Sequence, residues 1–208
     1  MADRGPVPHY PPAIDLPGFV KNDMAVSELL IRAVVLWFVL TGCLHTVFEG
    51  YYVMHHASLA GQMDLMGQLW KEYALSDSRY LTQDTFVLSI ETLTALLLGP
   101  LSFSTAAAIV TLHPMRHSLQ LIVSVAHIYG CALYFATATV DWLLKGTSHT
   151  RPEFVYVWIY YFGMNAVFML IPGVLVVQSL RETLLAFAAL DEKRSKRQAN
   201  GSNQRPNR

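Results

Sequence analysis

The sequence predicts an all-α fold, a polytopic bundle of four helices that cross a membrane. Of its 208 residues, 53% are hydrophobic and only 14% are charged, whereas charged residues make up about 25% of an average soluble domain. The charges gather near the ends and in the loops, which leaves four long stretches almost free of them. A bilayer core needs about 20 apolar residues in a helix, so each stretch is long enough to cross.

The predicted spans follow these stretches in order. The first is the least apolar, because His45 and Glu49 interrupt it, and the second carries Glu91 near its start. Pro100 in the second span and Pro172 in the fourth are expected to bend their helices. The expected bounds are 30–56, 86–112, 118–142 and 154–180.

Charge and cysteine content exclude several classes of protein. The formal net charge is zero, which argues against a nucleic-acid partner. Cys43 and Cys131 lie in apolar stretches without metal-ligand spacing, which excludes a disulfide scaffold. The first 25 residues are rich in proline and hold no hydrophobic run, so no cleavable signal peptide is expected.

A basic tail sets the predicted orientation. Its basic residues are Lys193, Arg194, Lys196, Arg197, Arg205 and Arg208. By the positive-inside rule this end is cytoplasmic, and four crossings then place the other end in the cytoplasm too. From Glu192 onward we expect a solvated, disordered end. The chain thus divides into a Pro-rich segment (1–29), a transmembrane domain (30–180) and a basic cytoplasmic tail (181–208).

Several polar residues lie inside the predicted spans. A charged side chain at the bilayer centre costs about 2.5–3.5 kcal/mol, so such residues usually face the bundle interior and carry function. His45 and Glu49 are four apart and share a helix face, Glu91 lies on the second span, and Asn165 lies on the fourth. They could form a structural hydrogen-bond cluster. We favour an acid–base site, because two carboxyls and an imidazole in a dry cavity suit proton transfer.

A metal site is the weaker interpretation of these residues. His45, Glu49, Glu91 and His127 could supply two imidazoles and two carboxylates. The sequence contains no His-x-x-His or Glu-x-x-His pair. No metal is therefore expected.

Short motifs follow one another in a fixed order over about residues 33–178. They are GCLHTVFEG (42–50), QLWKEY (68–73), DSRY (77–80), ETLTA (91–95), GPLS (99–102), HP (113–114), SVAHIYG (124–130), MNA (164–166) and PGVL (172–175). This series resembles the emopamil-binding protein family of the EXPERA superfamily, and residues 19–23 resemble the start of that family.

The resemblance implies a multi-pass enzyme of the endoplasmic reticulum membrane, a 3-beta-hydroxysteroid delta-8, delta-7 isomerase. Such an enzyme moves a ring double bond from 8(9) to 7(8) without a redox or metal cofactor. It protonates carbon 9 of the alkene, and the cation at carbon 8 then loses a proton from carbon 7. The expected partners are a sterol or related polycyclic lipid, cationic amphiphilic amines as inhibitors and the lipid bilayer. A homodimer is compatible with the resemblance.

The resemblance also implies roles for individual residues. His45, Glu49 and Glu91 are expected to be catalytic, with Glu91 and His45 as the proton donor and Glu49 as cation stabiliser or base. The expected substrate-binding residues are Thr94, Asn165, Phe168, Tyr80 and His127.

The sequence departs from the family in three ways. The family has five spans, whereas here residues 27–30, which resemble the start of the first span, run directly into the second. The other two departures bear on the substrate more than on the fold. Phe168 stands where the family has Trp, the best cation–π partner. His127 and Cys131 replace the Gln and Asp of the mammalian pattern.

Two other functions stay open. One is an isomerase or cyclase of another polycyclic terpenoid with the same acid–base set, which Phe168 favours. The other is a non-catalytic binder of sterols or amphiphilic amines, like the related sigma-2 receptor branch. The presence of His45, Glu49 and Glu91 together favours an enzyme over a binder.

Overall fold

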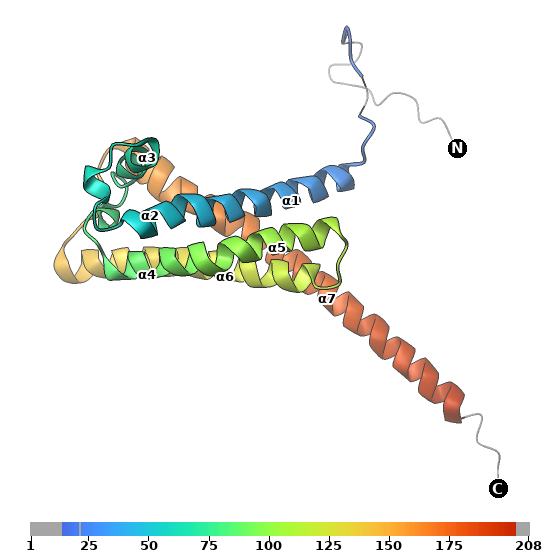
Figure 1. Cartoon of the computed structure of the whole chain (residues 1–208). Coiled ribbons are helices and arrows are strands. Elements are labelled where there is room, and N and C mark those ends of the chain that lie inside the picture. Colours follow the sequence, from blue (N-terminus) through green and yellow to red (C-terminus); the bar gives the residue numbers. More distant parts are fainter. Residues whose placement is uncertain (1–13, 21, 203–208) are drawn as a thin grey trace. The chain divides into compact units, whose positions relative to one another are not determined.

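The computed structural model describes residues 14–20 and 22–202, and within these ranges every regular element is helical (Figure 1). Residues 1–13 of the predicted Pro-rich segment lie outside the described residues, as do Arg205 and Arg208 of the tail. The chain forms two compact units, Met1–Ala33 and Val34–Arg208. All the contacts described below lie within the second unit.

The helices follow the predicted spans. The α-helices are α1 (Val26–Cys43), α2 (Gly50–His55), α3 (Leu65–Tyr73), α4 (Thr85–Leu93), α5 (Gly99–Val110), α6 (Arg116–Lys145) and α7 (Asn165–Ser202). Three π-helical segments lie between or before them: η1 (Leu44–Glu49), η4 (Thr94–Leu98) and η5 (Val155–Met164). The short 3-10 turns are η2 (Leu59–Gly61) and η3 (Ser78–Tyr80).

Four continuous helical stretches are long and apolar enough to cross a membrane: Val26–His55, Thr85–Val110, Arg116–Lys145 and Val155–Gln198. The prediction of an all-α chain with four such spans is therefore confirmed.

The helix of the fourth span is longer than the predicted span. Helix α7 continues to Ser202 instead of stopping near Leu180, so the expectation of disorder from Glu192 onward does not hold for residues 192–202. Residues 174–200 contain neither glycine nor proline, and Glu192 forms an ion pair with Lys196 one turn later. Such i,i+4 pairs and strong helix formers extend a helix once it has begun.

The π-helical segments determine where the polar residues of the spans lie. A π-helix is rare and often marks a functional site. Segment η1 contains both His45 and Glu49, and η4 begins at Thr94. A Cβ atom at Gly99 would lie 2.2 Å from Thr46 Oγ1. Only glycine therefore allows the end of η4 to approach η1 this closely.

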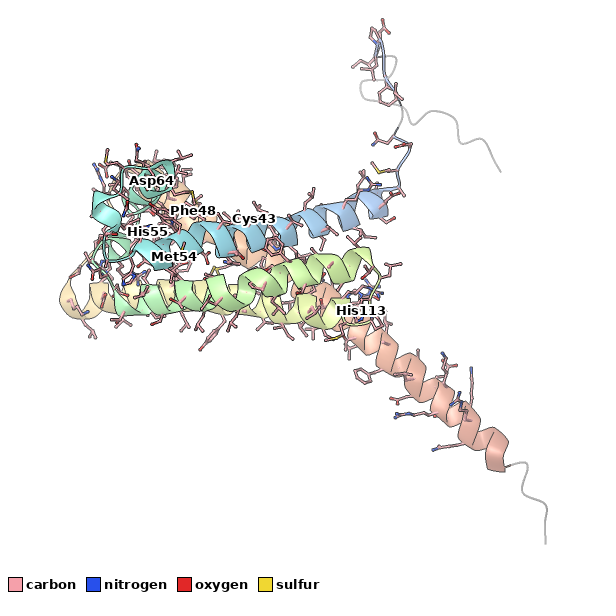
Figure 2. The ribbon with its side chains drawn as sticks, viewed as in Figure 1. Cys43, Phe48, Met54, His55, Asp64 and His113 are labelled. Atoms are coloured by element: carbon pink, nitrogen blue, oxygen red, sulfur yellow. The ribbon has the colours of Figure 1, made fainter. Side chains whose placement is uncertain are left out.

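The 3-10 turns and α3 cover one end of the bundle. Asp64 caps α3 by accepting a hydrogen bond from the Gly67 amide, and the Tyr51 hydroxyl donates to the same side chain at 2.7 Å. The Trp70 indole donates to the Phe48 carbonyl at 2.9 Å and stacks on the Phe48 ring at 4.3 Å. Asp64 and Phe48 are labelled in Figure 2. Helix α3 is thus fixed to the segment that carries the acid–base residues.

Two apolar clusters stabilise the second unit. One gathers aromatic residues below α3, including Tyr52, Trp70 and Tyr80. The other contains Trp37 and Phe38 of α1, together with small and branched residues of α5, α6 and α7. Both clusters border the cavity described next. Trp70 and Tyr80 of the first cluster line its wall, and so does Phe168, which packs against the second cluster.

Candidate functional site

The second unit encloses a cavity of about 390 Å³. Its wall is mostly aliphatic and aromatic, with a few polar groups, as in most sites for small lipophilic ligands. All eight residues predicted from the sequence line it: His45, Glu49, Tyr80, Glu91, Thr94, His127, Asn165 and Phe168. The structure therefore brings the predicted residues together, while the role of each stays a prediction.

His45 is the centre of one half of the site and is only 3% exposed. Its Nδ1 lies 2.8 Å from both carboxylate oxygens of Glu49, across one turn of η1. Its Nε2 lies 2.9 Å from Nε2 of His127, on α6. One imidazole therefore bridges a carboxyl and a second imidazole.

Glu91 belongs to the other half and is 8% exposed. The Tyr80 hydroxyl donates to Glu91 Oε1 at 2.7 Å. Burial raises the pKa of Tyr80 well above its usual value, and the nearby Glu91 carboxyl raises it further. Tyr80 therefore stays protonated and holds the Glu91 carboxyl in place, besides lining the cavity.

Thr94 connects the two halves. Its hydroxyl donates to Glu49 Oε2 and also lies 3.0 Å from the backbone oxygen of Glu91. The two acids thus face one cavity with different partners, an imidazole for Glu49 and a phenol for Glu91. His45 is therefore paired with Glu49 and not, as expected from the sequence, with Glu91.

Asn165 lines the cavity, as expected, but does not belong to this hydrogen-bond network. Its amide nitrogen donates to the Tyr161 carbonyl at 2.7 Å. Among the described residues it makes no hydrogen bond to an acid–base side chain. Asn165 is the first residue of α7, directly after η5, so its side chain can reach the backbone carbonyl of Tyr161 one turn earlier. It lines the cavity as a fixed amide.

Phe168 lies at the end of the cavity where the two imidazoles meet. Its ring centroid is 5.5 Å from that of His127 and 6.3 Å from that of His45. The indole of Trp37 packs against it at 5.2 Å. A tryptophan therefore lies directly behind the phenylalanine, outside the cavity wall.

Sequence reasoning missed other wall residues and one supporting contact. Buried residues of α6 recur at spacings of four and three: Gln120, Ser124, His127, Cys131 and Tyr134. This periodic stripe in an otherwise apolar span would have identified the face of α6 that meets the cavity. The supporting contact is the buried pair of Asp77 and Arg79, which directly precedes Tyr80.

The charges of the wall suit a cationic guest. The wall contains the carboxyls of Glu49 and Glu91 and, at an exposed position, that of Glu72, but neither lysine nor arginine. In a medium of low dielectric constant, carboxylates without a neighbouring cation attract a positively charged group strongly. The site can therefore donate and accept protons and stabilise a cation between these steps.

Comparison with known proteins agrees with the motif series. The family described as EXPERA (EXPanded EBP superfamily) matches residues 65–179. The chain is 40% identical to the 3-beta-hydroxysteroid-Delta(8),Delta(7)-isomerase of Cavia porcellus, over 78% of this chain and 69% of that protein. It is 33% identical to the enzyme of the same name from Mus musculus, over 89% and 92%. It is also 34% identical to an isomeliandiol synthase of Melia azedarach, over 86% and 81%. The chain therefore belongs to the EXPERA family, the expanded EBP superfamily.

Proposed function

We propose that this multi-pass membrane protein is a sterol isomerase that moves a ring double bond from 8(9) to 7(8). The observation that carries the proposal is the pair of carboxyls, Glu49 and Glu91, which face one apolar cavity with different hydrogen-bond partners. The names of the relatives from Cavia porcellus and Mus musculus support the same reaction. The resemblance to the emopamil-binding protein family supports a location in the endoplasmic reticulum membrane.

The reaction needs an acid, a base and a dry site. Protonated Glu91, held by Tyr80, donates its proton to carbon 9, and the alkene electrons form the new C–H bond. A cation remains at carbon 8, opposite the carboxylate of Glu49. Glu49, supported by His45, then takes a proton from carbon 7, and the electron pair of that C–H bond becomes the 7(8) double bond.

The direct test is incubation of membranes that contain the protein with an 8(9)-sterol in heavy water. We expect a 7(8)-sterol that carries one deuterium at carbon 9, because the added proton comes from an exchangeable acid. Mass spectrometry and NMR of the product give both the position of the double bond and the label. A product without deuterium at carbon 9 would contradict the assignment of an exchangeable acid. An 8(9)-sterol left unchanged by folded protein would contradict the proposed reaction.

A second candidate is an isomerase or cyclase of another polycyclic terpenoid. Two observations favour it: one relative is named isomeliandiol synthase, and Phe168 is smaller than the Trp that the family has at this position. The same acid–base pair would serve such a substrate, and the cavity wall at Phe168 would select it. If 8(9)-sterols are not converted, Phe168→Trp is the first variant to assay with them.

The carboxyl-rich wall also predicts binding of protonated amphiphilic amines, which imitate the cationic intermediate. Such an amine should bind Glu49→Gln at least about tenfold more weakly, because a hydrogen bond to a charged group is worth roughly 1.5–3 kcal/mol. Radioligand binding to membranes measures this change. Glu192→Gln, at an exposed carboxyl outside the cavity, serves as the matched control. Equal affinity in Glu49→Gln and the wild type would exclude Glu49 from the cation-facing role.

A further inference from the structure

The mechanism above leaves the two acids in the wrong protonation states after each turnover. Glu91 has lost its proton and Glu49 has gained one. The protein must therefore move a proton out of Glu49 before it can act as a base again. Two routes are open: direct transfer to Glu91, or exchange with water.

The histidine pair has the geometry of the second route. His45 Nδ1 contacts Glu49 at 2.8 Å, and the Nε2 atoms of His45 and His127 lie 2.9 Å apart. A separation of 2.9 Å is that of a hydrogen bond, so one proton lies between the two rings. His127 is only 4% exposed, and its Nδ1 points away from this bond, on the opposite side of its ring.

His127 Nδ1 is one of several buried polar atoms on neighbouring side chains that lack a hydrogen-bond partner within the described residues. Within the described part of the chain, His127 Nδ1, Ser124 Oγ and Trp37 Nε1 are buried without a hydrogen-bond partner. Ser124 lies three residues before His127 on α6, and the Trp37 ring meets the His127 ring edge-on at 6.3 Å. Buried polar atoms are nearly always hydrogen-bonded, often to an ordered water with about three polar partners.

We propose that His45 and His127 form a two-imidazole proton relay between Glu49 and a buried water beside Ser124 and Trp37. The inference rests on the proposed function, since it describes how that site is reset.

The relay transfers one proton while both imidazoles stay neutral. Before transfer, the Glu49 carboxyl donates to bare Nδ1 of His45, whose Nε2–H donates to bare Nε2 of His127. Three protons then shift together: from Glu49 to His45 Nδ1, from His45 Nε2 to His127 Nε2, and from His127 Nδ1 to the water, which passes a proton on to solvent. Glu91 takes up a proton from water through the cavity that it lines, so the charges of the two acids balance. Each imidazole has changed tautomer, and Glu49 is a carboxylate again. His127 acts through His45 and the water and exchanges no proton with the substrate, so it is a positioning residue and not a catalytic one.

An isotope experiment separates the relay from direct transfer between the acids. The substrate is an 8(9)-sterol with two deuterium atoms at carbon 7, converted over many turnovers in ordinary water. In the wild type, the removed deuteron should leave through His45 and His127, so the product keeps one deuterium. His127→Gln retains a hydrogen bond to His45 but cannot change tautomer. Its deuteron should pass from Glu49 to Glu91 and enter carbon 9 of a later substrate molecule, which raises the product by one mass unit.

The matched control is His113→Gln, the same exchange at an exposed histidine outside the cavity (Figure 2). It should give the wild-type product with one deuterium. Retained binding of an amphiphilic amine shows that the His127 variant is folded. A product with one deuterium from His127→Gln, or with two from the wild type, would overturn the relay.

A second measurement needs no turnover. In the wild type, nitrogen NMR of labelled histidine should give averaged shifts for both ring nitrogens of His45 and His127, because both tautomers are populated. In His127→Gln, the ring of His45 should be fixed with its proton on Nδ1. A single fixed tautomer of His45 in the wild type would refute the relay. If no 8(9)-sterol is converted, the proposed reaction fails on its own, and these spectra alone decide the relay.

Discussion

Glu91→Gln should lower turnover of an 8(9)-sterol by at least about 100-fold, because a positioned general acid contributes typically about 10²–10⁴-fold. Glutamine keeps the size of the side chain and can still accept the hydrogen bond that Tyr80 donates at 2.7 Å. It has no proton to give to carbon 9. The variant therefore removes the acid and leaves the wall of the cavity intact. Product formation by purified protein in lipid, at saturating substrate, measures the loss.

Two comparisons make this result specific. Glu192→Gln changes an exposed carboxyl outside the cavity and should keep wild-type turnover. Amine binding to Glu91→Gln should survive in part, because Glu49 still faces the cavity. Full activity in Glu91→Gln would remove the acid on which the mechanism depends, whatever the effect on amine binding.

Local spacing was a good guide to half of this site. His45 and Glu49 are four residues apart, and side chains at that spacing meet on a helix. They do meet here, at 2.8 Å, although their segment is π-helical. The spans were predictable for a similar reason, because runs of apolar residues report membrane crossing directly.

The rest of the site depends on contacts between distant segments, which no local pattern reports. His45 and His127 are 82 residues apart in sequence, and their contact follows from the packing of α6 near α1 and η1. The π-helical turns were not predictable either, because helix propensity does not distinguish their hydrogen bonds from those of an α-helix. The close approach at Gly99 became visible only when Thr46 was found beside it.

The Asp77–Arg79 pair is another feature that sequence reasoning did not identify, although both residues lie in one of the recognised motifs. Asp77 is 0% exposed and Arg79 is 1% exposed. Both carboxylate oxygens of Asp77 accept hydrogen bonds from Arg79, at 2.6–3.0 Å. Arg79 Nη1 also donates to Thr137 on α6 at 2.8 Å, and the guanidinium lies 4.8 Å from the centre of the Tyr134 ring. This pair anchors η3, and hence Tyr80, to α6.

Asp77→Asn should therefore lower the free energy of unfolding by about 3–5 kcal/mol, the cost of leaving one partner of a buried ion pair without its countercharge. Burial alone would lower the pKa of Arg79, but its hydrogen bonds to Asp77 and the charge of Asp77 raise it above the usual value. Arg79 therefore stays charged, and the loss of Asp77 exposes that charge to an apolar core. Unfolding of the protein in lipid by heat or denaturant measures the change.

Removal of both charges should lower the free energy of unfolding less than removal of Asp77 alone. In the double variant Asp77→Asn with Arg79→Met, no unpaired charge is buried, and replacing a whole buried pair by apolar groups is often close to neutral. Glu153→Gln breaks the ion pair with Arg151 in the loop before η5, where both side chains are about half exposed. It should cost little, because solvent screens exposed pairs. If Asp77→Asn were no more harmful than Glu153→Gln, the buried pair would not anchor η3.

Since Tyr80 directly follows Arg79 and holds Glu91, the loss of this anchor should also weaken amine binding in Asp77→Asn, and the double variant should restore it in part.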